Sequence, residues 1–386
     1  MSGKDWLCSI MVTFKINNIS LLFGIKFYGG DILLILLSIF WGIMICLILC
    51  APYSYYFLFI PMLLFTVIFL FIYRKKIKKI KILEFILIFA CFIFSYFITS
   101  FIIFKPVKYM LPNISIISTN KEAVIFYCEG EMEKYTPYYS NYFFKDAPYI
   151  LKPIYAFQIK QKYKILKVNP KINELTKVAE DVRSSLLNYK PYFFYIAFSG
   201  YYPEINSAIN SAILDGCGSI TIINYTKSRA IEDVVKNQID LEYLYKMGIK
   251  IKFTEPIYNS NLFAESISNR VKNMPIKYDG IIIVDEVTDT SSNIKSSLIY
   301  SGYFDDNIII DMNVDSSMEK FKKLNSTNIL YINLLDAGSG IRGEIDLPNR
   351  FKKYSTDMKI TGMNSWGYDK NLVKACIYEF LSCSLK

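Results

Sequence analysis

Residues 82–128 read ILEFILIFACFIFSYFITSFIIF, then KPVKYMLPNISIISTNKE, then AVIFYC, and they join two different kinds of sequence. The first segment holds one charge, Glu84, and is close to the roughly 20 residues that a helix needs to cross a bilayer core. The middle segment is polar and contains Pro106 and Pro112. The last segment is a short apolar run, typical of a strand covered on both faces. The chain therefore changes near residue 110 from a membrane part to an α/β part.

Two further apolar runs, at residues 32–50 and 55–73, contain no charge and precede the run at 82–104. The alternative is that they are buried core helices of a large soluble protein, but three such runs so close together leave no polar face for water. We expect three transmembrane helices in a multi-pass integral membrane protein, with the lipid bilayer as a partner. Polar residues interrupt residues 6–25, which predict an amphipathic lead-in, with a fourth span as the alternative.

The net charge of +10 is unevenly divided along the chain. Residues 1–109 hold 11 Lys and Arg against 3 Asp and Glu, a net +8, and residues 110–386 carry only +2. The nearly neutral α/β part has no concentrated basic face, which excludes a nucleic-acid partner. Six basic residues lie in the segment 74–81. Because basic loops stay in the cytoplasm, we expect the third span to place the α/β part outside it, although Lys105 and Lys108 favour the opposite side.

The residues that the chain lacks exclude several chemistries. There is no histidine, which excludes Ser-His-Asp and Cys-His catalysis and histidine zinc sites. The eight cysteines form no CxxC pair, so neither a zinc ribbon nor a thioredoxin site is indicated. We predict no resident cofactor, and the sequence identifies no protein partner.

The α/β part alternates short apolar runs with amphipathic stretches, which predicts a doubly wound parallel sheet with right-handed crossovers. At this length we expect two similar lobes after a linker at 110–120: residues 121–228 and 229–386, with a return of the C-terminal helix to the first lobe left open. The expected strands are 123–128, 193–198, 219–223, 249–253, 280–284, 307–310 and 328–335. The expected helices are 171–187, 203–215, 230–247, 261–273, 292–301, 317–324 and 369–381.

Ligands bind such sheets at the carboxyl ends of the strands, so the loops after the strands hold the candidate site residues. Asp285 and Glu286 directly follow the fifth strand and are candidate metal ligands. Glu286 is also a candidate catalytic acid or base. The competing interpretation is that these acids only cap the helix that follows.

The loop after the last expected strand contains Asp336, Gly338 and Gly340 and leads to Glu344. Backbone N–H groups of such a turn can bind an anion, which makes the three loop residues candidate ligand contacts. A plain tight turn is the alternative. Glu344 is a second candidate catalytic acid.

Two loops of the first lobe supply the remaining candidates. Ser199, Tyr201 and Tyr202 follow the second strand, and Glu129 follows the first. The tyrosine rings can stack on a flat ligand or simply cover surface. We take all four residues as candidate ligand contacts.

The stretch PYFFYIAFSGYYPEINSAINSAILDGCGSITIINY, at 191–225, resembles a strand, turn, helix and strand of the ferrochelatase-type (class II) tetrapyrrole chelatases. The resemblance extends over about residues 121–381. AVIFYCEGEMEKYTPYYSNYFF resembles the opening strand, glycine turn and helix of the family, and YKILKVNPKINELTKVAEDVRSSL its approach to a long helix. MKITGMNSWGYDKNLVKACIYEFL resembles its closing strand and helix. The resemblance implies a two-lobed fold with a tetrapyrrole-sized cleft.

The family's catalytic positions are changed in this chain. YDGIIIVDEVTD places Glu286 where the family has its histidine, and NILYINLLDAGSGIRGEIDL places Gly340 where it has its glutamate. Glu344 matches a later acidic residue of that motif, and Ser199 replaces a residue that is basic in many members. In the family, the histidine and glutamate serve metal delivery and the removal of pyrrole protons. The resemblance therefore supports binding better than turnover.

Three hypotheses follow. The first is a membrane-anchored ferrochelatase-like protein that binds a tetrapyrrole or a divalent metal and inserts Fe²⁺, as a substrate, into porphyrin. The second is a non-catalytic protein that captures heme, another tetrapyrrole or a metal chelate outside the cytoplasm. The third is an accessory protein whose α/β part docks a partner. Transport through the spans is disfavoured because they have essentially no interior charge.

Overall fold

The computed structural model describes residues 29–77, 81–105, 119–228, 231–238, 241–335, 340–364 and 366–384. The chain divides into two compact units, one of residues 1–105 with 143–158 and one of residues 106–142 with 159–386. The lead-in expected at residues 6–25 and most of the linker expected at 110–120 lie outside the described residues, as do Asp336 and Gly338.

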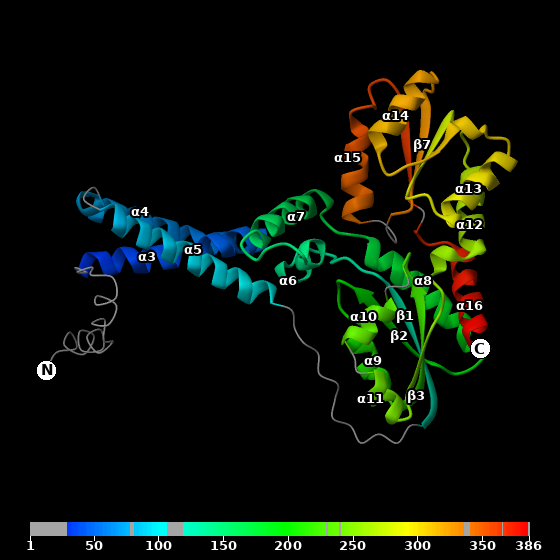
Figure 1. The fold of residues 1–386 in the computed structure, drawn as a ribbon, viewed down its shortest axis with the longest axis horizontal. Coiled ribbons are helices and arrows are strands. Elements are labelled where there is room, and N and C mark those ends of the chain that lie inside the picture. The colour runs from blue at the N-terminus through cyan, green and yellow to red at the C-terminus, as the bar shows by residue number, and fades with distance from the viewer. Residues whose placement is uncertain are drawn as a thin grey trace. The chain divides into compact units, whose positions relative to one another are not determined.

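Three helices of the first unit have the length and apolar composition to cross a membrane, at 32–50, 53–72 and 82–104. The three expected apolar helices are therefore present, although the second begins with a 3-10 turn. A Cβ at Gly42 would overlap Ser95 and the Phe92 carbonyl, so the glycine lets α3 and α5 approach closely. The Trp41 indole N–H donates to Thr66 Oγ1 at 3.1 Å and ties α3 to α4. The elements are α3 (Gly29–Cys50), η1 (Tyr53–Leu58), α4 (Phe59–Ile77) and α5 (Ile82–Phe104) (Figure 1).

The second unit begins with a four-stranded parallel sheet in the order β2-β1-β3-β4. In its central strands, the apolar run Ala123–Cys128 and nearly all of Cys217–Tyr225 are buried, as both-face coverage requires. The strands are β1 (Thr119–Glu129), β2 (Phe193–Ser199), β3 (Cys217–Tyr225) and β4 (Lys250–Phe253). The helices are α6 (Pro137–Ser140), η2 (Asn141–Phe144), α7 (Lys152–Leu166), α8 (Lys171–Leu187), α9 (Ile205–Leu214), α10 (Ile231–Gln238) and α11 (Leu241–Lys246).

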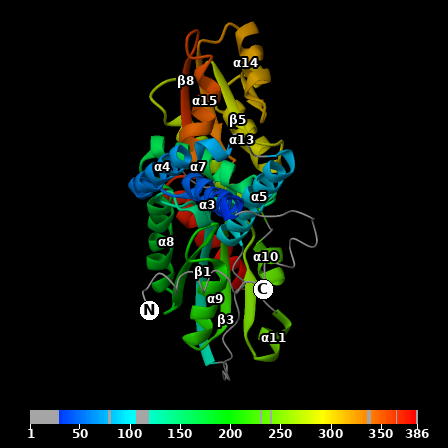
Figure 2. The ribbon, with the colours of Figure 1, turned by 90° about the vertical axis from the view of Figure 1, so that its left-hand side faces the viewer.

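A second four-stranded parallel sheet has the order β6-β5-β7-β8. Two of its strands, β5 and β8, are labelled in Figure 2. The prediction of an α/β fold with two similar parallel-sheet lobes is confirmed. The strands are β5 (Gly280–Val284), β6 (Ile308–Ile310), β7 (Asn328–Asn333) and β8 (Lys359–Asn364). The helices are η3 (Ile257–Asn259), α12 (Asn261–Lys272), α13 (Asp289–Tyr300), η4 (Asp305–Asn307), α14 (Val314–Lys323), η5 (Ile341–Asp346), α15 (Leu347–Lys352) and α16 (Lys370–Ser384).

Three differences from the sequence-based expectations concern the first lobe. The first lobe extends beyond residue 228, because β4 pairs with β3 in the first sheet. The helix expected at 230–247 consists of two helices, α10 and α11. The helix expected from Pro203 begins at Ile205, with Glu204 as its N-cap. The C-terminal helix α16 packs against α8 and β3 of the first lobe (Figure 1).

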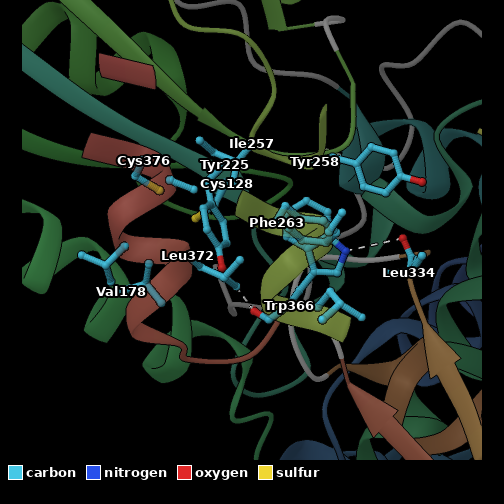
Figure 3. Packing of buried hydrophobic residues seen from close by; sticks show 14 of the residues in the cluster. Cys128, Val178, Tyr225, Ile257, Tyr258, Phe263, Leu334, Trp366, Leu372 and Cys376 are labelled. Carbon is cyan, nitrogen blue, oxygen red and sulfur yellow. Dashed lines mark hydrogen bonds between the residues drawn. The ribbon is translucent and has the colours of Figure 1, made fainter. Parts of the chain in front are cut away.

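Trp366, just beyond β8, lies in an apolar core that both lobes share (Figure 3). Its ring centroid lies 4.7 Å from that of Phe263 and 5.5 Å from that of Tyr225, and its ring stacks on Tyr258. The Trp366 indole N–H donates to the Leu334 carbonyl at 3.4 Å. Buried residues of β1, β3, β5 and β7 belong to the same cluster, so the two sheets are packed as one body.

Candidate functional site

Residues that follow strands of both sheets contact one another, so the carboxyl ends of the two sheets meet. The clearest contact joins Lys227, after β3, to Asp285, after β5, in an ion pair. The Asp285 side chain is fully buried, and the Lys227 side chain is 25% exposed. The Tyr258 hydroxyl also donates to Asp285. The candidate metal ligand Asp285 is thus already neutralised and hydrogen-bonded.

Tyr258 connects this ion pair to the start of α13. Its hydroxyl lies 2.7 Å from Thr288 Oγ1, and Lys227 Nζ lies 5.0 Å from the centre of its ring. Burial, and then the hydrogen bond to Asp285, raise the pKa of Tyr258 well above its ordinary value. Tyr258 therefore remains a protonated donor, and Thr288 caps α13 by accepting from the Ser291 N–H. In the loop after β5, the residue that caps the following helix is therefore Thr288.

Glu131, two residues beyond β1, forms a second buried contact between the lobes and is not among the site residues predicted from the sequence. Its carboxylate accepts from Asn169 Nδ2 at 2.7 Å and from Lys171 Nζ at 3.3 Å. It also accepts from the Ile341 N–H of the second lobe at 3.0 Å. Glu131 and Lys171 are both nearly inaccessible, with side chains 5% and 3% exposed. A buried carboxylate with three donors is well satisfied, and this one fixes the η5 start against the first lobe.

Gly340 occupies the position where the family resemblance implies a glutamate. A Cβ at Gly340 would lie 2.6 Å from both carboxylate oxygens of Glu131. The space next to Gly340 is therefore filled by the carboxylate of Glu131, which comes from the other lobe. An acidic side chain is present at this place, but Lys171 already neutralises it.

The other acidic candidates lie apart from these two ion pairs. Glu286 is exposed, although it adjoins the buried Asp285. Glu344 is exposed in η5, and its pKa is raised by partial burial and then by the nearby charge of Glu174 on α8. Glu129 is half-buried at the end of β1, opposite Ser199 in the sheet register. Among the described residues, no group of three or more Cys, Asp or Glu is arranged to hold a metal ion.

The tyrosines after β2 lie on different surfaces. Tyr201 packs against Phe198 and Tyr139, with ring centroids 6.2 and 5.0 Å away. Tyr202 is 58% exposed and lines a groove of about 540 Å³ along the edge strand β2. The groove lies between α8 and α9, and its volume is within the range of small-molecule sites. Its lining consists of Thr176, Glu180, Arg183, Phe194, Tyr195, Ile196, Phe198, Tyr202, Pro203, Ser207, Ala208 and Ser211.

A groove of about 640 Å³ lies along β6, the edge strand of the second sheet. It is lined by apolar residues of β6 and by Lys295, Lys320 and Lys323, together with Asp305 and Asp306. Lys295 is paired with Asp305 at 2.8 Å. The groove contains none of the candidate residues and no aromatic ring, so the β2 groove, which contains Tyr202, is the better candidate for a flat ligand.

No protein family model matches the chain, and a comparison with curated proteins finds no match. Among solved structures, the chain is similar to SirB from Bacillus subtilis with Fe³⁺, with 13% identity, a TM-score of 0.44, and coverage of 68% of this chain and 95% of that chain. It is similar to the sirohydrochlorin chelatase SirB from Bacillus subtilis subspecies spizizenii in complex with cobalt, with 12% identity, a TM-score of 0.45, and coverage of 69% and 96%. It is also similar to a multidomain protein from Deinococcus radiodurans with structural similarity to chelatases, with 9% identity, a TM-score of 0.39, and coverage of 68% and 54%.

Proposed function

We propose that the α/β part binds a flat, negatively charged ligand of the tetrapyrrole class and does not insert a metal into it. The observation that carries the proposal is the β2 groove, which combines aromatic rings with a cation. Phe194 and Tyr202 offer apolar faces to a planar ring system, and Arg183 offers a guanidinium to a carboxylate of the ligand. Glu180 lines the same groove three residues before Arg183 on α8, so we expect the ligand's carboxylates to contact Arg183 and to avoid Glu180.

The buried ion pairs favour binding over turnover. Removal of pyrrole protons needs a free base, and delivery of a metal needs ligands that are not already neutralised. Lys227 neutralises Asp285, and Lys171 neutralises Glu131. The α/β part would then act as a receptor or carrier rather than as an enzyme.

Metal insertion remains a second candidate function because of Glu344. Its raised pKa and the proximity of Glu174 are properties of a carboxyl group suited to proton exchange. In this alternative, Fe²⁺ is a substrate, Glu344 accepts a pyrrole proton, and Glu286 contributes an oxygen ligand from the exposed loop after β5.

We further propose that the three apolar helices anchor the protein in a membrane and that the α/β part lies outside the cytoplasm. With three spans, the basic segment 74–81 and the α/β part lie on opposite sides of the bilayer, and the basic segment is expected in the cytoplasm. Tyr300 is 94% exposed in the α/β part, so Tyr300→Cys is a suitable reporter. A membrane-impermeant maleimide should label it in intact cells. Labelling only after lysis would place the α/β part in the cytoplasm.

The full chain in nanodiscs allows binding and turnover to be separated. Protoporphyrin IX and heme are titrated while the Soret band is followed, and Fe²⁺ or Zn²⁺ is then added without oxygen. The proposal predicts saturable binding and no metalloporphyrin. Metalloporphyrin that forms in the native chain and is lost in Glu344→Gln would establish the second candidate instead. Absence of binding to either ligand would contradict both.

A further inference from the structure

The segment between α6 and the middle of α7 belongs to the same compact unit as the apolar helices, although the sequence separates them by β1. Ser100 Oγ of α5 donates to the Tyr149 carbonyl, and the ring centroids of Phe101 and Tyr149 lie 5.1 Å apart. The Phe104 ring lies 5.6 Å from the Phe144 ring. Ala156 is fully buried in a cluster with residues near the ends of α3 and α5. Residues 143–158 are therefore packed on the end of the helix bundle at which α3 and α5 finish.

A second face of this segment, separate from the face of Ala156 that is packed on the bundle, is apolar and exposed. Ile150 and Leu151 are each 38% exposed, Ile154 is 44% exposed, and Tyr155 is 37% exposed. Leu151, Ile154 and Tyr155 have the three- and four-residue spacing that places them on one face of the α7 start. Lys152 lies on the other face, where its ammonium donates to the Lys145 carbonyl at 3.1 Å and lies 4.6 Å from the centre of the Tyr149 ring.

We infer that residues 143–158 form an interfacial segment, whose face of Ile150, Leu151, Ile154 and Tyr155 lies at the boundary between lipid headgroups and acyl chains. We assign the bilayer as its occupant because Tyr149, directly before Ile150, packs against Phe101 on the apolar surface of α5. Phe101 and Ile102 of α5 are exposed on that surface. An apolar face that contains a tyrosine and lies beside the end of a span is typical of segments at the membrane–water interface. The inference rests on the proposed membrane insertion of the three helices.

Depth-dependent fluorescence quenching tests the inference in the full chain. Trp6→Phe and Trp41→Phe leave Trp366, which is buried in the α/β core, as the background tryptophan. Ile154→Trp is added, and the chain is reconstituted in phosphatidylcholine vesicles that carry bromines either near the headgroup end or near the middle of the acyl chain. The added fluorescence should be quenched, and more strongly by the shallow bromines. Tyr155→Trp provides the same readout if Ile154→Trp does not fold.

Two controls separate a failure of the inference about the segment from a failure of membrane insertion. Tyr300→Trp, at an exposed position of the α/β part, should show no quenching. In the otherwise native chain, Trp41 of α3 should be quenched by the deep bromines, which reports membrane insertion independently of the segment. If Trp41 is quenched while both segment variants behave like Tyr300→Trp, the inference is overturned, and the face is covered by protein instead. If Trp41 is not quenched, the membrane anchor itself fails, and the inference fails with it.

Discussion

Lys227 of the first lobe forms an ion pair with Asp285 of the second, and the Asp285 carboxylate is completely buried. The contact joins the ends of β3 and β5, so it holds the two sheets together at the edge where ligands bind in parallel sheets. Asp285 is the acid that the sequence indicates most directly as a metal ligand, and its pairing with Lys227 makes it unavailable to a metal.

Lys227→Met should destabilise the α/β part by about 3 kcal/mol, because it leaves a buried carboxylate without a counter-charge. Asp285→Asn in the same chain should recover most of that loss, since no charge then remains buried. Urea unfolding of the detergent-solubilised Trp6→Phe, Trp41→Phe chain, followed by Trp366 fluorescence, measures both effects. Equal stability of the single and double variants would show that the ion pair is not what Lys227 contributes.

Gly340→Ala should destabilise the contact between the lobes by about 1 to 3 kcal/mol, because its methyl group would collide with the Glu131 carboxylate. The substitution is sterically mild elsewhere, since the φ of Gly340 is extended and suits any residue. Gly302→Ala is a contrasting variant: nothing lies within 4 Å of its Cβ, but its φ of +93° is strained for alanine. Urea unfolding followed by Trp366 fluorescence measures the loss, and an unchanged stability of Gly340→Ala would contradict the predicted collision with Glu131.

The pH dependence of stability should report Glu344. Its pKa in the folded protein is raised above the ordinary value of 4.5 by partial burial and by Glu174. The folded state therefore binds more protons than the unfolded state just above pH 4.5, and stability falls as the pH rises through the folded pKa. In Glu344→Gln this fall should be absent, so the variant should gain melting temperature relative to the native chain at neutral pH. If the melting temperatures of the two chains change in parallel from pH 4 to 7, Glu344 is not the group responsible for the pH dependence.

The strands could be predicted because they are continuous apolar runs, as at Gly280–Val284, where every residue is buried. β8 is absent from the periodicity-based strands because its edge position leaves it a mixed sequence, KITGMN, and only the family resemblance indicated a closing strand. α7 was also missed, since one part of it packs on the apolar helices and another part belongs to the α/β unit. Its residues show no single apolar stripe.

The site was harder to predict than the fold. Asp285 stood out because it follows a buried strand, but its partner Lys227 comes from a different lobe. Glu131 and Gly340 meet only because two distant loops converge. Because glycine has no side chain, the sequence at Gly340 does not indicate that a carboxylate lies next to it.

Binding of protoporphyrin IX by the full chain in nanodiscs, compared between variants of the β2 groove, tests the proposed function most directly. Tyr202→Ala should weaken binding about tenfold through lost stacking, and Arg183→Gln by a similar factor through a lost charge-assisted contact. Tyr300→Ala, a matched exposed position outside the groove, should bind like the native chain. Saturable Soret shifts with this pattern are the predicted result. Equal affinity in all four chains, or no binding in the native chain, would contradict the assignment of the groove as a tetrapyrrole site.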